Sequence, residues 1–132
     1  MRKVLFVCVH NAGRSQMAEA FFNHYATDAL GLSAGTHAGS RINPQAADAM
    51  REIGISMEGQ SPKQMTPEMI AESDRIITMG CGVDAESCPA GFLVTEDWGL
   101  DDPAGQPIEV VRKIRDEIKK RVLALIQELN NA

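Results

Sequence analysis

The sequence predicts an α/β fold in which helices cover both faces of a parallel β-sheet. Short apolar runs with the composition of buried strands alternate with segments whose apolar residues recur every three or four positions. This alternation is typical of parallel sheets. The chain has 132 residues, of which 44% are hydrophobic, and this is enough for one core. With no internal repeat, linker or low-complexity segment, the chain is expected to form one domain over residues 1–132.

Four segments have the composition of strands. The first is expected at residues 3–9, around the apolar run Val4-Leu5-Phe6-Val7. Further strands are expected at 30–34 and 75–79, and a weaker signal indicates a fourth at 92–95. Parallel strands end at one edge of the sheet, and α/β folds bind their ligands there. Residues that follow these strands are therefore candidates for a site.

Four helices are expected between and after the strands. An Ala- and Met-rich segment predicts the first at 15–26. The second starts with Asn43 as its cap and Pro44 at its first position, and it stops at Gly54. Thr66-Pro67 repeats this start signal for a shorter helix that ends near Ser73. The last helix covers 111–129, where apolar residues face the core and Lys and Glu face outward.

The segment between the first strand and the first helix predicts an anion-binding loop with a nucleophile. Backbone N–H groups of such a loop, and of the helix that follows, bind anions well. Cys8 stands at its start, and donors of this kind favour a thiolate. Arg14 offers a planar, two-pronged donor for the oxygens of a tetrahedral anion. Ser15 is expected to cap the helix and to donate to the Cys8 thiolate. The candidate anion-binding residues are Val9, His10, Asn11, Ala12, Gly13, Arg14 and Ser15.

An alternative interpretation is that Cys8 is a buried core thiol and Arg14 a surface charge. The combination of Cys, five residues, Arg and Ser directly after a strand argues against it.

Two further cysteines, Cys81 and Cys88, follow the third strand. Their spacing does not fit a structural zinc site, so no metal is expected. If 83–88 is helical, the two lie about 10 Å apart, whereas a disulfide needs Cα atoms within about 7 Å. A disulfide between them would therefore require the segment to unwind. Three thiols, each able to attack the next, would make a relay.

The segment Trp98-Gly99-Leu100-Asp101-Asp102-Pro103 follows the fourth strand and should reach the same edge of the sheet. A carboxylic acid there can protonate a leaving oxygen. Asp102 is the candidate, because the following proline restricts its backbone, and Asp101 is the lesser one. The alternative is that both residues form a solvated turn.

Charge and composition restrict the partners. The net charge is −5 with no basic stripe, which argues against nucleic acid or a membrane surface as a partner. No apolar run reaches the length of a membrane span, and there is no signal peptide, so a cytoplasmic protein is expected. Three cysteines, an odd number, favour reactive thiols over a disulfide framework.

These motifs together resemble the thioredoxin-coupled arsenate reductases, which share the fold and anion loop of low-molecular-weight protein tyrosine phosphatases. The matching segments are Val4 to Cys8, Ser15 to Glu19, Leu32 to Thr36, Cys81 to Cys88-Pro89, and Trp98 to Gly105. The resemblance implies a four-stranded sheet of order 2-1-3-4, a monomer, and a role in arsenic detoxification with arsenate and other tetrahedral oxyanions as ligands.

The resemblance also implies a mechanism. Cys8 would attack arsenate, Arg14 and the loop would bind its oxygens, and Asp102 would protonate the departing water. Cys81 would then attack the Cys8 sulfur, which releases arsenite and leaves a Cys8–Cys81 disulfide. Cys88 would convert this into a Cys81–Cys88 disulfide, which thioredoxin would reduce. No cofactor is implied beyond this external reductant.

Two departures from the family pattern stand out. Some relatives carry another cysteine inside the loop, where this chain has Ala12 and Gly13. Some relatives bind potassium with residues that match Asn11, Glu19 and Ser33, plus an aspartate in whose place this chain has Lys63. We expect the Lys63 ammonium to replace the cation.

Two other functions are considered. A tyrosine phosphatase would use the same Cys8, Arg14 and Asp102, but it would leave Cys81 and Cys88 without a role and would need an aromatic-walled slot. A non-catalytic thiol module that binds arsenite or senses oxidants would use the cysteines, but it would not need Asp102.

Overall fold

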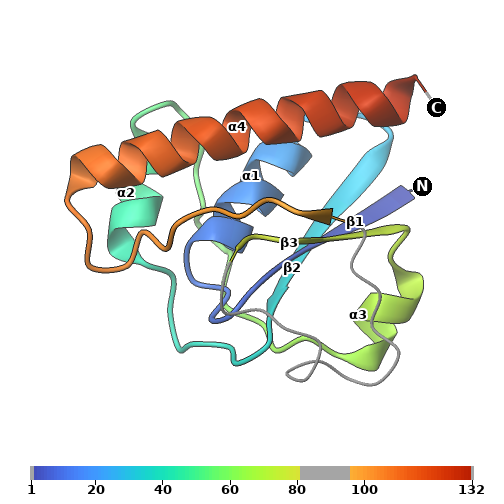
Figure 1. Cartoon of the computed structure of the whole chain (residues 1–132), viewed down its shortest axis with the longest axis horizontal. Coiled ribbons are helices and arrows are strands. Elements are labelled where there is room, and N and C mark those ends of the chain that lie inside the picture. Colours follow the sequence, from blue (N-terminus) through green and yellow to red (C-terminus); the bar gives the residue numbers. More distant parts are fainter. Residues whose placement is uncertain (1, 81–95, 132) are drawn as a thin grey trace.

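The computed structural model describes residues 2–80 and 96–131 (Figure 1). The elements, in chain order, are β1 (Arg2–Cys8), α1 (Arg14–Tyr25), β2 (Ala29–Gly35), α2 (Pro44–Arg51), α3 (Pro67–Glu72), β3 (Arg75–Thr78), β4 (Glu96–Asp97) and α4 (Ile108–Asn130). All strand pairs are parallel, and the order is β2-β1-β3-β4. The predicted fold class and strand order are confirmed.

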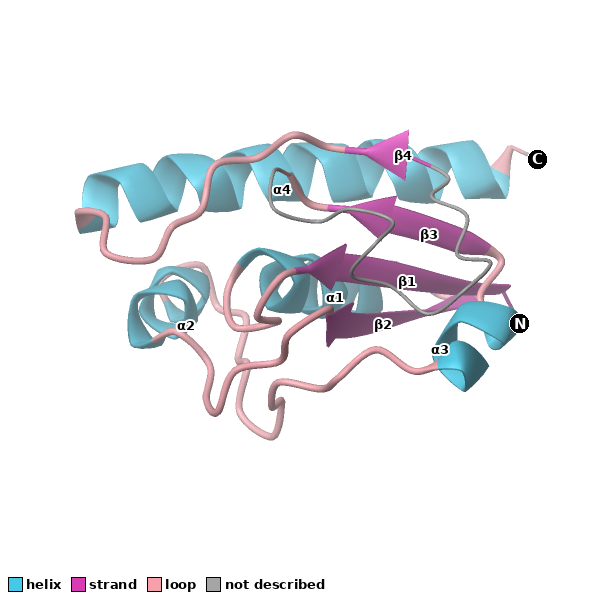
Figure 2. Ribbon diagram, turned by 60° about the horizontal axis from the view of Figure 1, so that its bottom comes forward, coloured by secondary structure: helices cyan, strands magenta, loops and turns pink. Residues whose placement is uncertain are grey.

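The register places the carboxyl ends of the strands together. Cys8 at the end of β1 lies opposite Gly35 at the end of β2. Val7 lies opposite Thr78 at the end of β3, which in turn pairs with Asp97 of β4. The chain therefore leaves β1 and β4 at the same edge of the sheet, where β3 also ends, as Figure 2 shows.

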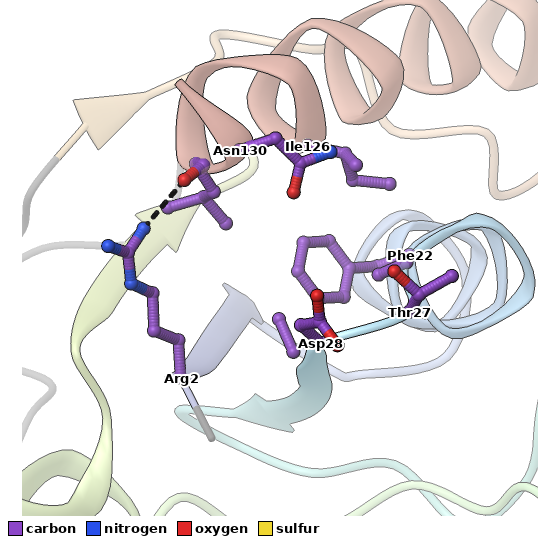
Figure 3. Close-up of a pocket in the computed structure, with 9 residues that line it drawn as sticks. Arg2, Phe22, Thr27, Asp28, Ile126 and Asn130 are labelled. Carbon is purple, nitrogen blue, oxygen red and sulfur yellow. Dashed lines mark hydrogen bonds between the residues drawn. The ribbon is translucent and has the colours of Figure 1, made fainter. Parts of the chain in front are cut away.

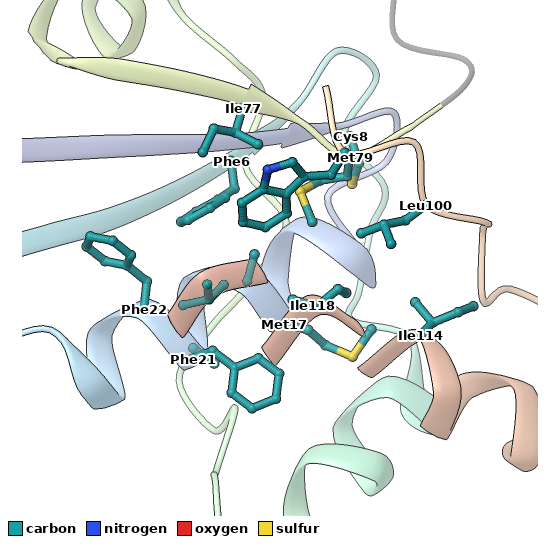
Figure 4. Close-up of a cluster of buried hydrophobic side chains, with 14 of the residues drawn as sticks. Phe6, Cys8, Met17, Phe21, Phe22, Ile77, Met79, Leu100, Ile114 and Ile118 are labelled. Atoms are coloured by element: carbon teal, nitrogen blue, oxygen red, sulfur yellow. The ribbon is translucent and has the colours of Figure 1, made fainter. Parts of the chain in front are cut away.

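Alternation along β1 divides the core between the two faces of the sheet. Figure 1 shows α1, α2 and α4 on one side of the sheet and α3 on the other. Val4, Phe6 and Cys8 belong to the larger cluster, which α1 and α4 cover (Figure 4). Leu5 and Val7 belong to a smaller cluster with residues in and before α3. The nucleophile candidate is therefore the last residue of the strand that contributes to both halves of the core.

Most helix boundaries follow the predicted signals. Asn43 caps α2 by accepting a hydrogen bond from the Gln45 N–H at 2.9 Å, and Thr66 caps α3 through the Met69 N–H at 3.2 Å. The fourth strand predicted at 92–95 lies outside the described residues, and β4 covers the two residues that follow. Within the described ranges, no helix combines the length and apolar content that crossing a membrane requires.

A cavity of about 360 Å³ opens at the opposite, amino-terminal end of the sheet (Figure 3). Phe22 and Ile126 contribute apolar walls, while Arg2 and Asp28 contribute charges at its rim. Arg2 donates a hydrogen bond to the carbonyl of Leu129 at 2.9 Å. No sequence-predicted site residue lines this cavity.

Candidate active site

The Cys8 thiol is buried and forms hydrogen bonds with Asn11 and Ser15. Its side chain is 3% exposed. The Asn11 N–H donates to Sγ at 3.2 Å, and the Ser15 Oγ lies 2.8 Å from it. Donors this close stabilise a thiolate, which is the nucleophilic form of cysteine.

Asn11 stabilises the loop through its backbone conformation and its side-chain hydrogen bonds. Its backbone has a positive φ of 52°, a conformation that asparagine tolerates better than most residues. Its buried amide Nδ2 donates to the Ser15 Oγ at 2.7 Å, and its Oδ1 accepts from the Lys63 N–H at 2.8 Å. Since Ser15 Oγ accepts this bond, its single hydrogen is available for Cys8 Sγ.

The prediction that Ser15 caps α1 is wrong. The cap position is Gly13, and no side chain caps the helix. The Ser15 hydroxyl is instead hydrogen-bonded to the Cys8 thiol and to the Asn11 side-chain amide. Within the described part of the chain, the N–H groups of residues 12–16 have no protein acceptor. Unpaired donors at a helix start are suited to an anion.

Arg14 is held beside the thiol and the acid candidate. Its side chain is 5% exposed, and Nη1 donates to the Leu100 carbonyl at 2.9 Å. Nη2 lies 4.0 Å from the Asp102 Oδ2. Asp102 itself is 56% exposed, and its Oδ1 accepts from the Ala104 N–H at 3.0 Å. The guanidinium is thus fixed in place, whereas the carboxyl group is in contact with solvent.

Gly80 allows the segment after β4 to approach Arg14. It has a φ of +139°, a conformation that favours glycine. A Cβ at this position would lie 2.3 Å from the Leu100 carbonyl oxygen and 3.0 Å from Arg14 Nη1. The absence of a side chain at Gly80 therefore permits the hydrogen bond between Leu100 and Arg14.

These groups meet in a cavity of about 60 Å³. Its described lining is Cys8, His10, Ala12, Gly13, Arg14, Asn43, Asp102 and Ala104. On this measure a cavity of about 10–15 Å³ holds one water molecule, and pockets for drug-sized ligands measure about 300–1,000 Å³. The cavity therefore has the size of a small inorganic anion. It brings together the predicted nucleophile, guanidinium and acid.

Not every predicted residue lines the cavity. Val9, Asn11 and Ser15 do not line it. Asn11 and Ser15 are buried beside Cys8 and are hydrogen-bonded to each other. Asn43 and Ala104 line it without having been predicted. The sequence indicated Asn43 only as a helix cap, and its N–H also donates to the Ala12 carbonyl at 2.7 Å. The thiols Cys81 and Cys88 lie outside the described residues.

The ring of His10 has a defined orientation at the edge of the cavity. Its Nδ1 lies 3.0 Å from the His37 carbonyl oxygen. Because a carbonyl oxygen only accepts, Nδ1 is the donor in this hydrogen bond.

Lys63 lies beside Glu19, where we expected its ammonium group to replace a bound cation. Its Nζ is 3.7 Å from Glu19 Oε1, which also accepts from the Ser33 Oγ at 3.0 Å. A potassium ion held by the same oxygens would lie against this ammonium group, so these residues do not fit the ion. Within residues 2–80 and 96–131, no group of three or more His, Cys, Asp or Glu side chains could hold a metal ion.

Comparison with known proteins identifies the family. Residues 3–132 match the family described as low molecular weight phosphotyrosine protein phosphatase. The chain belongs to this family. The glutaredoxin arsenate reductase of Synechocystis is 36% identical over 131 residues, covering 98% of this chain and 100% of the relative.

The similar solved structures include two arsenate reductases. An arsenate reductase in the phosphate binding state is 36% identical with a TM-score of 0.86, over 97% of this chain and 98% of the other. The thioredoxin-dependent arsenate reductase of Corynebacterium glutamicum is 37% identical with a TM-score of 0.81, over 98% of this chain and 62% of the other. The resemblance predicted from the motifs is therefore confirmed at the level of family and relatives.

Proposed function

We propose that this member of the family reduces arsenate to arsenite, using Cys8 as the nucleophile and a small thiol protein as the electron donor. The observation that carries the proposal is the cavity of about 60 Å³, where a buried thiol, a buried guanidinium and an exposed carboxyl group meet. Its size favours an inorganic oxyanion over an organic phosphate ester. Relatives named as arsenate reductases support the choice of anion.

In the first step, the Cys8 thiolate attacks arsenic and an As–S bond replaces an As–O bond. The oxygen leaves as water after it takes a proton from Asp102. Arg14 and the free N–H groups of residues 12–16 bind the remaining oxygens. Arsenic remains pentavalent in this step, so no electron donor is needed.

In the second step, a thiolate attacks the Cys8 sulfur and the As–S electron pair passes to arsenic. Arsenite is released, arsenic gains two electrons, and the two thiols become a disulfide. We assign this attack to Cys81, followed by transfer of the disulfide to the Cys81–Cys88 pair. The disulfide needs an external dithiol, and the relatives include both a thioredoxin-dependent and a glutaredoxin arsenate reductase.

The second candidate function is phosphatase activity. The family description favours it, and Cys8, Arg14 and Asp102 would serve it equally well. The difference is the second step, in which water would attack the phosphorus of the Cys8 adduct and no electrons would move.

One experiment separates the two functions. Arsenate-dependent NADPH oxidation is measured with thioredoxin and its reductase, and separately with glutaredoxin, glutathione and glutathione reductase. We expect turnover with one donor system, and loss of turnover in Cys8→Ser, Cys81→Ser and Cys88→Ser. Hydrolysis of an aryl phosphate is measured in parallel. No arsenate turnover with either donor, together with hydrolysis that requires only Cys8, would assign the protein as a phosphatase.

A further inference from the structure

A line of side-chain hydrogen bonds connects Cys8 to a residue far along the chain. Gln60 Nε2 donates to Gln16 Oε1 at 2.6 Å, and Gln16 Nε2 donates to Asn11 Oδ1 at 2.8 Å. Asn11 Nδ2 then donates to Ser15 Oγ at 2.7 Å, and Ser15 Oγ lies 2.8 Å from Cys8 Sγ. Four hydrogen bonds thus separate Gln60 from the nucleophile.

Backbone groups fix the orientation of each amide in this line. Gln60 Nε2 also donates to the Gln16 carbonyl at 3.2 Å, and Gln16 Nε2 donates to the Ser61 carbonyl at 2.9 Å. A carbonyl only accepts, so these amide nitrogens cannot exchange places with their oxygens. The Lys63 N–H only donates, and it fixes Asn11 Oδ1 in the same way. The three amide bonds of the line therefore point toward Cys8, and the hydrogen of the Ser15 hydroxyl is left for Sγ when Cys8 is a thiolate.

The inner part of the line is shielded from water. Gln16, Asn11 and Ser15 are each 0% exposed. Hydrogen bonds in series polarise one another, and they do so most where the surroundings have a low dielectric constant. Gln60 is half-buried at the outer end and lines a surface cavity of about 510 Å³. The stability of the Cys8 thiolate should therefore depend on a residue that solvent reaches.

We propose that Gln16 and Gln60 are positioning residues of the nucleophile. They hold the Asn11 amide so that Nδ2 faces Ser15, and this leaves the Ser15 hydroxyl hydrogen for the Cys8 thiolate. The inference goes beyond the proposed function, because it concerns the reactivity of Cys8 whether the bound anion is arsenate or phosphate.

Gln60→Glu tests the proposal with almost no change of shape. The new carboxylate accepts but does not donate, so it faces the acceptor Oε1 of Gln16. The hydrogen bond from residue 60 to Gln16 Oε1 is then lost, and the carboxylate repels this oxygen, so the line loses its outer donor and the Gln16 amide is displaced. Gln64→Glu is the matched control. It makes the same change of charge in the same segment, but Gln64 bonds to Thr36 and Ala38, outside the line.

The readout is the pH dependence of Cys8 alkylation by iodoacetamide in chains that also carry Cys81→Ser and Cys88→Ser. Cys8 is then the single thiol, because the chain has three cysteines. We expect Gln60→Glu to slow alkylation about 3- to 10-fold at neutral pH and to move the profile upward by about 0.5–1 pH unit. Gln64→Glu should match the wild type, and both variants should be folded by circular dichroism. Equal shifts in both variants, or none in Gln60→Glu, would overturn the proposal.

Discussion

Replacing Gly80 by alanine should lower activity, because the added Cβ would displace the main-chain carbonyl of Leu100. The added Cβ would lie 2.3 Å from the Leu100 carbonyl oxygen, whereas real Cβ atoms stay beyond about 3.0 Å, so the carbonyl must move by roughly 0.7 Å. The hydrogen bond from Arg14 Nη1 to this carbonyl is 2.9 Å long. A shift of that size away from Arg14 would leave no hydrogen bond there.

The expected effect has two parts. A non-glycine residue in such a sparsely populated conformation costs about 1–3 kcal/mol, and the displaced carbonyl adds to this. At roughly 4 °C per kcal/mol, the melting temperature of Gly80→Ala should fall by at least about 4 °C. Misplacing a substrate-binding group by a fraction of an ångström to 1 Å should lower kcat/KM about 10- to 100-fold.

Gly54→Ala is the control that separates the cost of backbone strain from the effect of displacing the Leu100 carbonyl. Gly54 also has a positive φ of +81°, but a Cβ there would meet nothing within 4 Å. We therefore expect a similar strain cost by thermal unfolding, with arsenate turnover equal to the wild type. If Gly80→Ala retained wild-type kcat/KM with only the stability loss of Gly54→Ala, the role assigned to the Leu100 contact would be refuted.

Three further predictions concern other groups. Asp102→Asn should lower arsenate turnover about 10²- to 10⁴-fold while leaving the rate of Cys8 alkylation unchanged; full turnover would exclude the carboxyl group as the acid. Wild-type turnover should not respond to potassium chloride when choline chloride is the control, and strong activation would contradict the assignment of Lys63 as the replacement for the ion. The Arg112 hydrogen bond lowers the pKa of Glu52 below its ordinary value of 4.5, so this pair stabilises the fold above pH 4.5 and the contribution is lost as pH falls through the folded-state pKa. Urea unfolding of Glu52→Gln should therefore show lower stability at pH 7 and a weaker decrease below pH 4.5 than the wild type, and parallel curves would contradict this.

Local signals were sufficient for most of the fold. The apolar run before Cys8 and the two start signals, Asn43-Pro44 and Thr66-Pro67, each depend on residues a few positions apart, and the structure confirms all of them. The strand order was available only through the family resemblance, because alternation of strands and helices does not determine which strand is central.

The site was predictable where one loop contains it. Cys8 and Arg14 lie on the same short segment, so their spacing alone indicated the chemistry. The contacts of Arg14 with Leu100 and of Gln16 with Gln60 join residues 86 and 44 positions apart. A glutamine in a polar segment looks like any surface residue, so the sequence gives no signal for such partners. Ser15 was misassigned because the local capping rule does not include the competing thiol and Asn11 amide.

The charges in the cavity explain why it contains a buried guanidinium, that of Arg14, and an exposed carboxyl group, that of Asp102. A thiolate and an arsenate anion together place several negative charges in about 60 Å³, although the protein already has a net charge of −5. In the proposed reaction the guanidinium of Arg14 would offset only part of this charge. The N–H groups of residues 12–16, which have no acceptor among the described residues, would supply the rest. Arg14 is buried, and its guanidinium is held there by the hydrogen bond to the Leu100 carbonyl at 2.9 Å. In the proposed reaction Asp102 would give a proton to the leaving oxygen and take one up again after each turnover, and at 56% exposure its side chain is in direct contact with water.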